Sequence, residues 1–159
     1  MRTRLLLLAL LPLSCKPAPE PAASPAPLSG RGIFMARCIA CHQPDGSGLA
    51  GICPPLENSP ALSGPPENLI RILLLGMKGG IVRHGSAYSG IMPAWRFDLN
   101  DGQIADVIND LCLRWNPGAP AITGEMIRRI RDETASQKLF PTASDPEVSE
   151  SPNSLPPRL

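Results

Sequence analysis

The most informative stretch of this chain is Cys38-Ile39-Ala40-Cys41-His42. Two thiols at this spacing can each add across one vinyl group of a haem, and the adjacent imidazole is then delivered to the iron. A redox dithiol has no need of His42, and a zinc site needs further ligands at short spacing, which the neighbouring sequence lacks. The pattern therefore predicts one haem c, attached covalently through Cys38 and Cys41 and ligated by His42.

The composition predicts that only the middle of the 159-residue chain is folded. The 20 prolines are concentrated in residues 12–27 and 141–157, where apolar periodicity is absent. We therefore expect one domain at 29–135 and a disordered tail at 136–159. Aromatic residues make up only 4% of the chain, and a flat apolar haem would supply the bulk that such a core lacks. A formal net charge of +1 gives no indication of nucleic-acid binding.

The first 28 residues have the layout of an export signal followed by a spacer. Residues 1–4 include two arginines, and residues 5–13 are mostly apolar but too few to cross a bilayer. Ser14-Cys15 resembles the cleavage and lipidation site of bacterial lipoproteins, so 1–14 is predicted as a signal peptide and Cys15 as the lipidation site. Ordinary cleavage nearby is the alternative. The Pro- and Ala-rich linker that completes 15–28 would span on the order of 40 Å if extended.

A short helix is expected at Gly30–Cys38, where Gly30 and Phe34 lie one turn apart on one face. This stretch resembles the first helix of class I cytochromes c, in which a glycine and an aromatic residue precede the first haem cysteine at the same intervals. In that family the first helix crosses the last one. The resemblance therefore implies an all-α, class I cytochrome c fold with three to five helices around one covalently bound haem.

The last helix of that pattern is expected after Asn100, which caps it together with Gln103. Apolar residues then follow at spacings of three and four and form one stripe: Ile104, Val107, Ile108, Leu111 and Trp115. On the family pattern, Val107 and Leu111 are expected to pack against the glycine and the aromatic residue of the first helix.

Two further helices are expected. Pro66–Leu75 is apolar nearly all round, which indicates a helix buried against the haem. Thr123 is placed to cap a short basic helix from Gly124 to about Thr134, whose arginines would face a partner or water. The segment that precedes it, Trp115–Thr123, is similar to the end of the haem domains in cytochrome subunits of bacterial membrane-bound dehydrogenases.

The glycine-rich segment from Gly76 to Trp95 is expected to be a long functional loop. It contains Met92-Pro93, which resembles the axial ligand segment of class I cytochromes c. A thioether is a soft, neutral sixth ligand, and the neighbouring proline would keep the segment stiff. Met92 is therefore expected on the iron opposite the histidine, with Met77 and His84 of the same loop as the alternatives.

Three other residues are expected around the haem. Cytochromes of this class use the carbonyl of a proline about twelve residues after the histidine to accept its second ring proton, and Pro54 lies at that interval from His42. Tyr88 and Trp95 are expected to line the haem edge, although plain packing is an alternative for both.

Two cysteines remain without a role. Cys53 lies beside the proline loop and Cys112 near the end of the last helix. Because an exported chain is oxidised, an even pair of thiols tends to close, so a Cys53–Cys112 disulfide is one expectation. Inert packing of either thiol is the other.

The resemblance implies a one-electron carrier, because an iron with two protein ligands is closed to substrates. The implied partners are a dehydrogenase, a quinol-oxidising complex or a terminal oxidase or reductase. The export signal implies the bacterial periplasm, with a lipid anchor at Cys15 holding the domain at a membrane. A haem-based sensor or peroxidase-like enzyme, whose Met92 dissociates, is the alternative. It would need a nearby base, and the sequence offers only His84.

Overall fold

The computed structural model describes residues 28–140. The predicted signal peptide, the lipidation site Cys15 and nearly all of the predicted linker lie outside the described residues, as does 141–159. Within 28–140 the chain forms six helices and four short strands. None of the helices in this range combines the length and the apolar character needed to cross a membrane.

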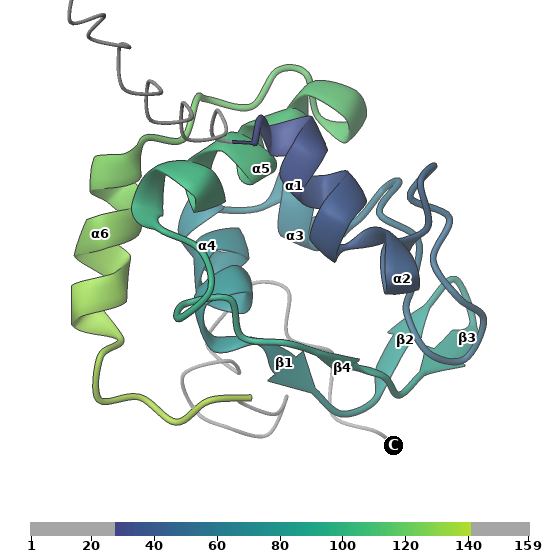
Figure 1. Ribbon diagram of the computed structural model, residues 1–159. Helices are drawn as coiled ribbons and strands as arrows, with labels where there is room; N and C mark the ends of the chain where they lie inside the picture. Colours follow the sequence, from purple (N-terminus) through teal and green to yellow (C-terminus); the bar gives the residue numbers. More distant parts are fainter. Residues whose placement is uncertain (1–27, 141–159) are drawn as a thin grey trace, which may run out of the picture.

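Four of the helices occupy the positions predicted from the sequence. Figure 1 shows α6 on one side of α4 and α5, with α1 and α2 on the other. The one-turn helices α2 and α3 are additional. The bounds are α1 Gly30–Arg37, α2 Ile39–His42, α3 Pro60–Ser63, α4 Pro66–Leu75, α5 Asp101–Trp115 and α6 Gly124–Glu133.

Local side-chain chemistry fixes where the longer helices begin and end. Asn100 accepts a hydrogen bond from the Gln103 N–H at 2.9 Å, and the Gln103 side chain accepts one from the Asn100 N–H at 3.0 Å. This confirms the predicted capping box at the start of α5. Thr123 caps α6 as predicted, by accepting from the Met126 N–H at 3.3 Å. Gly76 ends α4 with a φ of 70°, which a glycine adopts without steric cost.

The glycine at the start of α1 allows this helix to lie directly against α5. A Cβ atom at Gly30 would fall 2.0 Å from the backbone oxygen of Asp106 and 3.1 Å from the Cβ of Asp110. The residues nearest to Gly30 are therefore these two aspartates, not the predicted Val107 and Leu111. Val107 and Leu111 instead line the internal cavity together with Phe34, the other residue against which they were expected.

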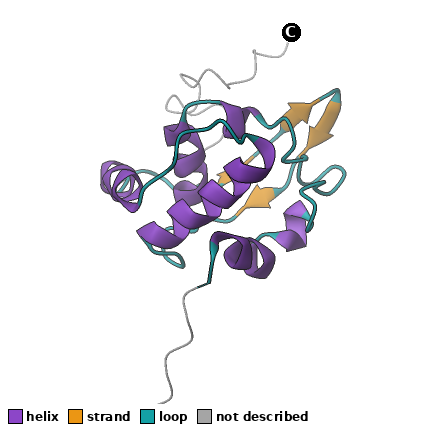
Figure 2. Cartoon of the chain, turned by 90° about the horizontal axis from the view of Figure 1, so that it is seen from above, coloured by secondary structure: helices purple, strands orange, loops and turns teal. Residues whose placement is uncertain are grey.

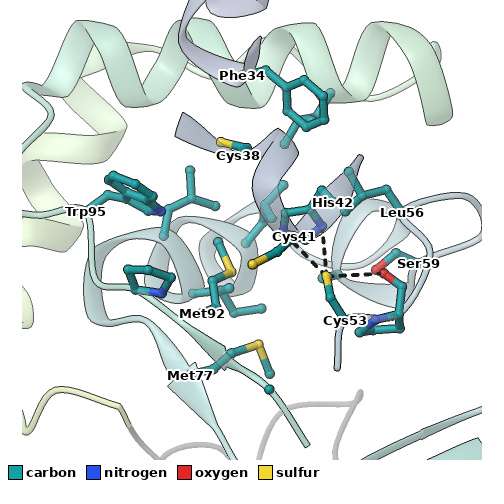
Figure 3. Close-up of a pocket in the computed structure, with 18 of the residues that line it drawn as sticks. Phe34, Cys38, Cys41, His42, Cys53, Leu56, Ser59, Met77, Met92 and Trp95 are labelled. Carbon is teal, nitrogen blue, oxygen red and sulfur yellow. Dashed lines mark hydrogen bonds between the residues drawn. The ribbon is translucent and has the colours of Figure 1, made fainter. Parts of the chain in front are cut away.

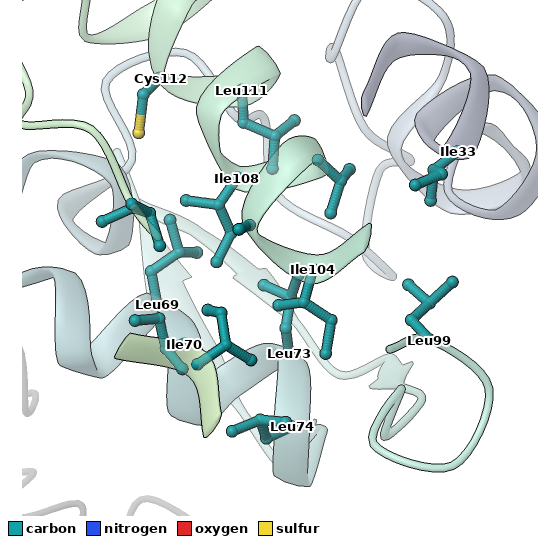
Figure 4. Packing of buried hydrophobic residues seen from close by; sticks show 14 of the residues in the cluster. Ile33, Leu69, Ile70, Leu73, Leu74, Leu99, Ile104, Ile108, Leu111 and Cys112 are labelled. Carbon is teal, nitrogen blue, oxygen red and sulfur yellow. The ribbon is translucent and has the colours of Figure 1, made fainter. Parts of the chain in front are cut away.

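Helices α4, α5 and α6 enclose one apolar core. Ile104 and Ile108 of α5 are 0% and 1% exposed and lie among the leucines and isoleucines of α4, as Figure 4 shows. Ile127 and Ile130 of α6 close the core from the far side and are equally buried. The predicted stripe at spacings of three and four is thus the core face of α5.

The predicted loop between α4 and α5 contains two small antiparallel sheets. Strand β1 (Met77–Lys78) pairs with β4 (Ile91–Met92), and β2 (Ile81–Arg83) pairs with β3 (Ser86–Tyr88). Figure 2 shows these strands beside the helices. The expectation of an all-α fold is therefore corrected to a mainly helical fold with short strands. The turn from β2 to β3 is formed by His84 and Gly85, which both have positive φ, as a two-residue hairpin turn requires.

One arginine of α6 joins this helix to the start of α5. Arg131 donates from Nε to a carboxylate oxygen of Asp101 at 2.7 Å and from Nη2 to the backbone oxygen of Leu99 at 3.0 Å. Arg128 and Arg129 are exposed, as expected for a basic helix facing water.

The domain extends beyond its expected end at residue 135. The Phe140 N–H donates to the backbone oxygen of Leu75 at 2.8 Å. Leu139 packs against the hydrophobic core. Residues 136–140, which were expected to begin the disordered tail, therefore contact the end of α4.

Candidate functional site

A cavity of about 310 Å³ lies between the helices and the strands. Figure 3 shows His42 and Cys53 on one side of this space and Trp95 and Met92 on the other. Its lining brings together six of the seven predicted haem-binding residues, namely Cys38, Cys41, His42, Pro54, Met92 and Trp95. The segment that follows α1 and the segment that precedes α5 thus meet at one site.

The turn between α1 and α2 positions the attachment motif. The backbone oxygen of Cys38 accepts hydrogen bonds from the Cys41 N–H at 3.2 Å and from the His42 N–H at 2.9 Å. Residues three and four apart share a helix face. One helical turn therefore presents both thiols and the imidazole to the same cavity.

Burial shifts the pKa of two groups at this site in the direction that favours their neutral forms. It lowers the pKa of His42 below its ordinary value, which favours the neutral imidazole that can bind a metal. It also raises the pKa of the Cys38 thiol to about 11. A mostly apolar lining of this kind suits a large apolar cofactor.

The ring of His42 contacts a cysteine. Its Nδ1 lies 3.2 Å from the Cys53 sulfur, and the Cys53 thiol donates in turn to the Pro54 carbonyl at 3.7 Å. In the described residues the carbonyl predicted to accept from the imidazole thus accepts from this thiol instead. The loop is held close by Gly48, which has a φ of 74° and where a Cβ would fall 2.3 Å from the Cys53 carbonyl oxygen.

The expected Cys53–Cys112 disulfide is wrong, because both thiols are free. Cys53 is half-buried in the cavity lining. Cys112 is 9% exposed and belongs to the hydrophobic core, where Figure 4 shows it on α5. The two side chains therefore occupy different interior spaces, and the alternative expectation of packing holds for Cys112.

Backbone contacts fix the position of Met92. It is paired in register with Met77 across β1 and β4. A Cβ atom at Gly76 would lie 2.6 Å from the Met92 carbonyl oxygen, so the two segments touch. The Trp95 N–H donates to the Leu73 backbone oxygen at 2.8 Å, which fastens the segment to α4. Both thioethers, Met92 and its alternative Met77, are half-buried and line the cavity.

Two residues of the hairpin that were singled out from the sequence lie away from the cavity. Tyr88 lies outside the cavity lining, because it belongs to β3, the strand of the hairpin that does not line the cavity. His84 is exposed in the hairpin turn and is likewise not part of the lining. The sequence reasoning missed Arg83, which does line the cavity. The run Ile81-Val82-Arg83 is too short to show strand alternation, so no signal in the sequence pointed to this residue.

Comparison with known proteins agrees with this geometry. Residues 25–109 match the protein family described as cytochrome C oxidase, cbb3-type, subunit III. This match covers more than half of the chain and includes both haem-motif cysteines, the histidine and Met92. The chain belongs to the class I c-type cytochromes.

Relatives of this cytochrome include a protein of its own size and parts of larger ones. It is 34% identical over 117 residues to cytochrome c-552 of Thermus thermophilus, covering 68% of this chain and 86% of that protein. It is 36% identical over 110 residues to the gluconate 2-dehydrogenase cytochrome c subunit of Pantoea cypripedii, covering 67% of this chain but 25% of the relative. For the alcohol dehydrogenase (quinone) cytochrome c subunit of Gluconacetobacter polyoxogenes, the identity is 31% over 113 residues, with 69% and 24% covered. The chain thus spans about a quarter of these dehydrogenase subunits.

The cavity fits the covalently bound haem c that membership of this family implies. Three thiols, an imidazole and two thioethers border one mostly apolar space. Soft sulfur and imidazole donors are those that haem iron takes in electron carriers. The buried Nε of Arg83 is left without a hydrogen-bond partner by the polypeptide at this same cavity.

Proposed function

We propose that this cytochrome carries single electrons between redox proteins, with one haem c attached through Cys38 and Cys41 and ligated by His42 and Met92. One observation carries the proposal: the attachment motif and Met92, fifty residues apart, border the same cavity. When bound, haem supplies a reversible one-electron couple, and a thioether ligand favours its reduced state.

The polypeptide contributes attachment, orientation and exclusion of water. The helical turn at Cys38 directs the thiols and the imidazole to one face of the cavity. Trp95 and the buried Leu73 cover the side where Met92 lies. With His42 and Met92 both holding the iron, the iron would be closed to substrates, which is the arrangement of a carrier.

The alternative function, a sensor or peroxidase-like enzyme, needs a base within reach of the iron. The only histidine besides His42 in the sequence is His84. Its side chain is exposed in the β2–β3 turn and does not line the cavity. No contact in the described residues therefore favours this alternative.

The partners in this proposal are a dehydrogenase, a quinol-oxidising complex or a terminal oxidase or reductase. Some relatives are named as cytochrome c subunits of gluconate and alcohol dehydrogenases, which favours a dehydrogenase among these three kinds of partner. We place the domain in the bacterial periplasm, exported by residues 1–14 and anchored by a lipid at Cys15. The Pro-rich linker would keep it at high local concentration near a membrane-bound partner.

The test uses the full chain expressed in a bacterium that attaches haem to exported proteins. The pyridine haemochrome assay should find one haem per chain, and the purified protein should exchange electrons reversibly with small redox mediators. Replacing both Cys38 and Cys41 by serine should abolish covalent haem. Cys15→Ser should release the protein from the membrane fraction with an unchanged spectrum. Turnover of peroxide at enzyme rates, about 1–10³ per second, with Met92 intact would contradict the proposal.

A further inference from the structure

Arg83 is the one residue that brings a buried, unpartnered polar group to the cavity. Its Nε is fully buried and has no hydrogen-bond partner, and no other buried side-chain nitrogen or oxygen within residues 28–140 is left in that state. An unpaired buried donor on a charged group costs more free energy than a neutral one, so such groups are normally paired. A ligand that supplies the missing acceptor is the simplest account.

The hairpin aims this side chain at the cavity. Successive residues of a strand point to opposite faces. Ile81 and Arg83 of β2 line the cavity, whereas Val82 between them is 48% exposed. The turn at His84 and Gly85 follows directly and fixes the register in which Arg83 pairs with Ser86. Arg83 therefore reaches the cavity through the pairing of β2 and β3.

The charges around the cavity favour an anion. No acidic residue is among those that line it. The charged lining residues are Arg37 of α1, which is exposed, and Arg83. The remaining titratable lining groups are the thiols and imidazole of Cys38, Cys41, His42 and Cys53. Burial lowers the pKa of the Arg83 guanidinium. No carboxylate of the described residues lines the cavity to offset its charge.

We propose that Arg83 binds a propionate carboxylate of the haem and so holds that propionate ionised. The proposal rests on the haem assigned to this cavity under the proposed function. A guanidinium presents parallel N–H donors that match the two oxygens of a carboxylate. Arg83 is then a residue that tunes the reduction potential, because an ionised propionate and its cationic partner both lie near the iron.

The expected effect has a definite sign. Deprotonation of a propionate adds negative charge near the iron and favours the oxidised state, so the midpoint potential falls as the pH rises through the propionate pKa. A cationic partner lowers a carboxylate pKa by about 1–3 units. Removing Arg83 should therefore displace this fall of the potential to higher pH by about 1–3 pH units.

The experiment compares the holoprotein with Arg83→Met, Arg83→Lys and the control Lys78→Met. Lys78 is an exposed cation of the neighbouring β1 strand and does not line the cavity. Midpoint potentials are measured by spectroelectrochemistry from about pH 4 to about pH 9, which brackets a carboxylate titration. The propionate bending band in the resonance Raman spectrum gives a readout independent of electron transfer.

Arg83→Met should move both the pH profile and the Raman band, Arg83→Lys should move them less, and Lys78→Met should leave both unchanged. A profile and band for Arg83→Met that match those of Lys78→Met would overturn the inference. If Arg83→Met fails to fold, an Arg83→Lys protein that matches the wild type in both readouts would also overturn the inference. Wild-type protein without covalent haem would instead refute the proposed function.

Discussion

Replacing Gly30 by alanine should destabilise the domain, although alanine is the better helix former. A Cβ atom here would lie 2.0 Å from the Asp106 oxygen and 2.5 Å from the Asp106 carbonyl carbon. These are backbone atoms of α5, which cannot turn away as the end of a side chain can. Helix α1 must then move outward from α5.

The size of the effect follows from two opposing contributions. Overpacking a close interface costs typically 1–3 kcal/mol, and contact with backbone at Gly30 places this case near the upper end, about 3 kcal/mol. Alanine regains up to about 1 kcal/mol through the lower entropy of its unfolded chain. The net loss in the free energy of unfolding should be about 2 kcal/mol.

Gly32 offers a matched control in the same helix. A Cβ atom there would meet its nearest neighbours, in Leu28 and Ser29, at 3.4 Å, which is close to ordinary contact. Gly32→Ala should therefore be neutral or stabilising by less than about 1 kcal/mol. Both holoproteins are unfolded in guanidinium chloride and followed by far-ultraviolet circular dichroism. Equal stability of Gly30→Ala and Gly32→Ala would refute the close approach of α1 to α5.

Three other results are expected. Met92→Ala should lower the reduction potential and let carbon monoxide or cyanide bind, whereas Met77→Ala should leave the visible spectrum unchanged; the reverse outcome would assign the ligand to Met77. Arg131→Met should cost about 1.5–3 kcal/mol in the same unfolding assay, because it removes charge-assisted hydrogen bonds, while the equivalent change at an exposed arginine of α6 should cost little. Mass spectrometry of unreduced holoprotein should find Cys53 and Cys112 as free thiols. Because burial raises the pKa of Cys53 to about 11, its labelling by iodoacetamide should still speed up about tenfold between about pH 9 and about pH 10; a rate that levels off above about pH 9 would contradict the raised pKa.

The features predicted correctly from the sequence are those that depend on local spacing. The helix that leads into the haem motif and the capping box of Asn100 and Gln103 each involve contacts between residues within four positions. Such contacts form wherever the helix forms, so the chain order alone reveals them. The apolar stripe of α5 likewise needed only its period.

The features that were missed depend on pairing between distant or very short segments. Strands of two or three residues are too short to show alternation, so β1 to β4 could not be distinguished from a loop. Without the β2–β3 pairing, nothing distinguished Arg83 from Tyr88 as the residue that lines the cavity. The spacing of Cys53 and Cys112 along the chain likewise does not reveal that their side chains pack in separate spaces.

The attachment of the β4 segment to α4 also bears on how fast a carrier can work. Pairing with β1 on one side of Met92 and the Trp95 to Leu73 hydrogen bond on the other hold this stretch by its own backbone. The backbone that carries Met92 is therefore held by the polypeptide itself, so under the proposed ligation its thioether would start from a fixed position. A ligand that keeps its place in both oxidation states requires little reorganisation energy, so the intrinsic barrier to self-exchange is small.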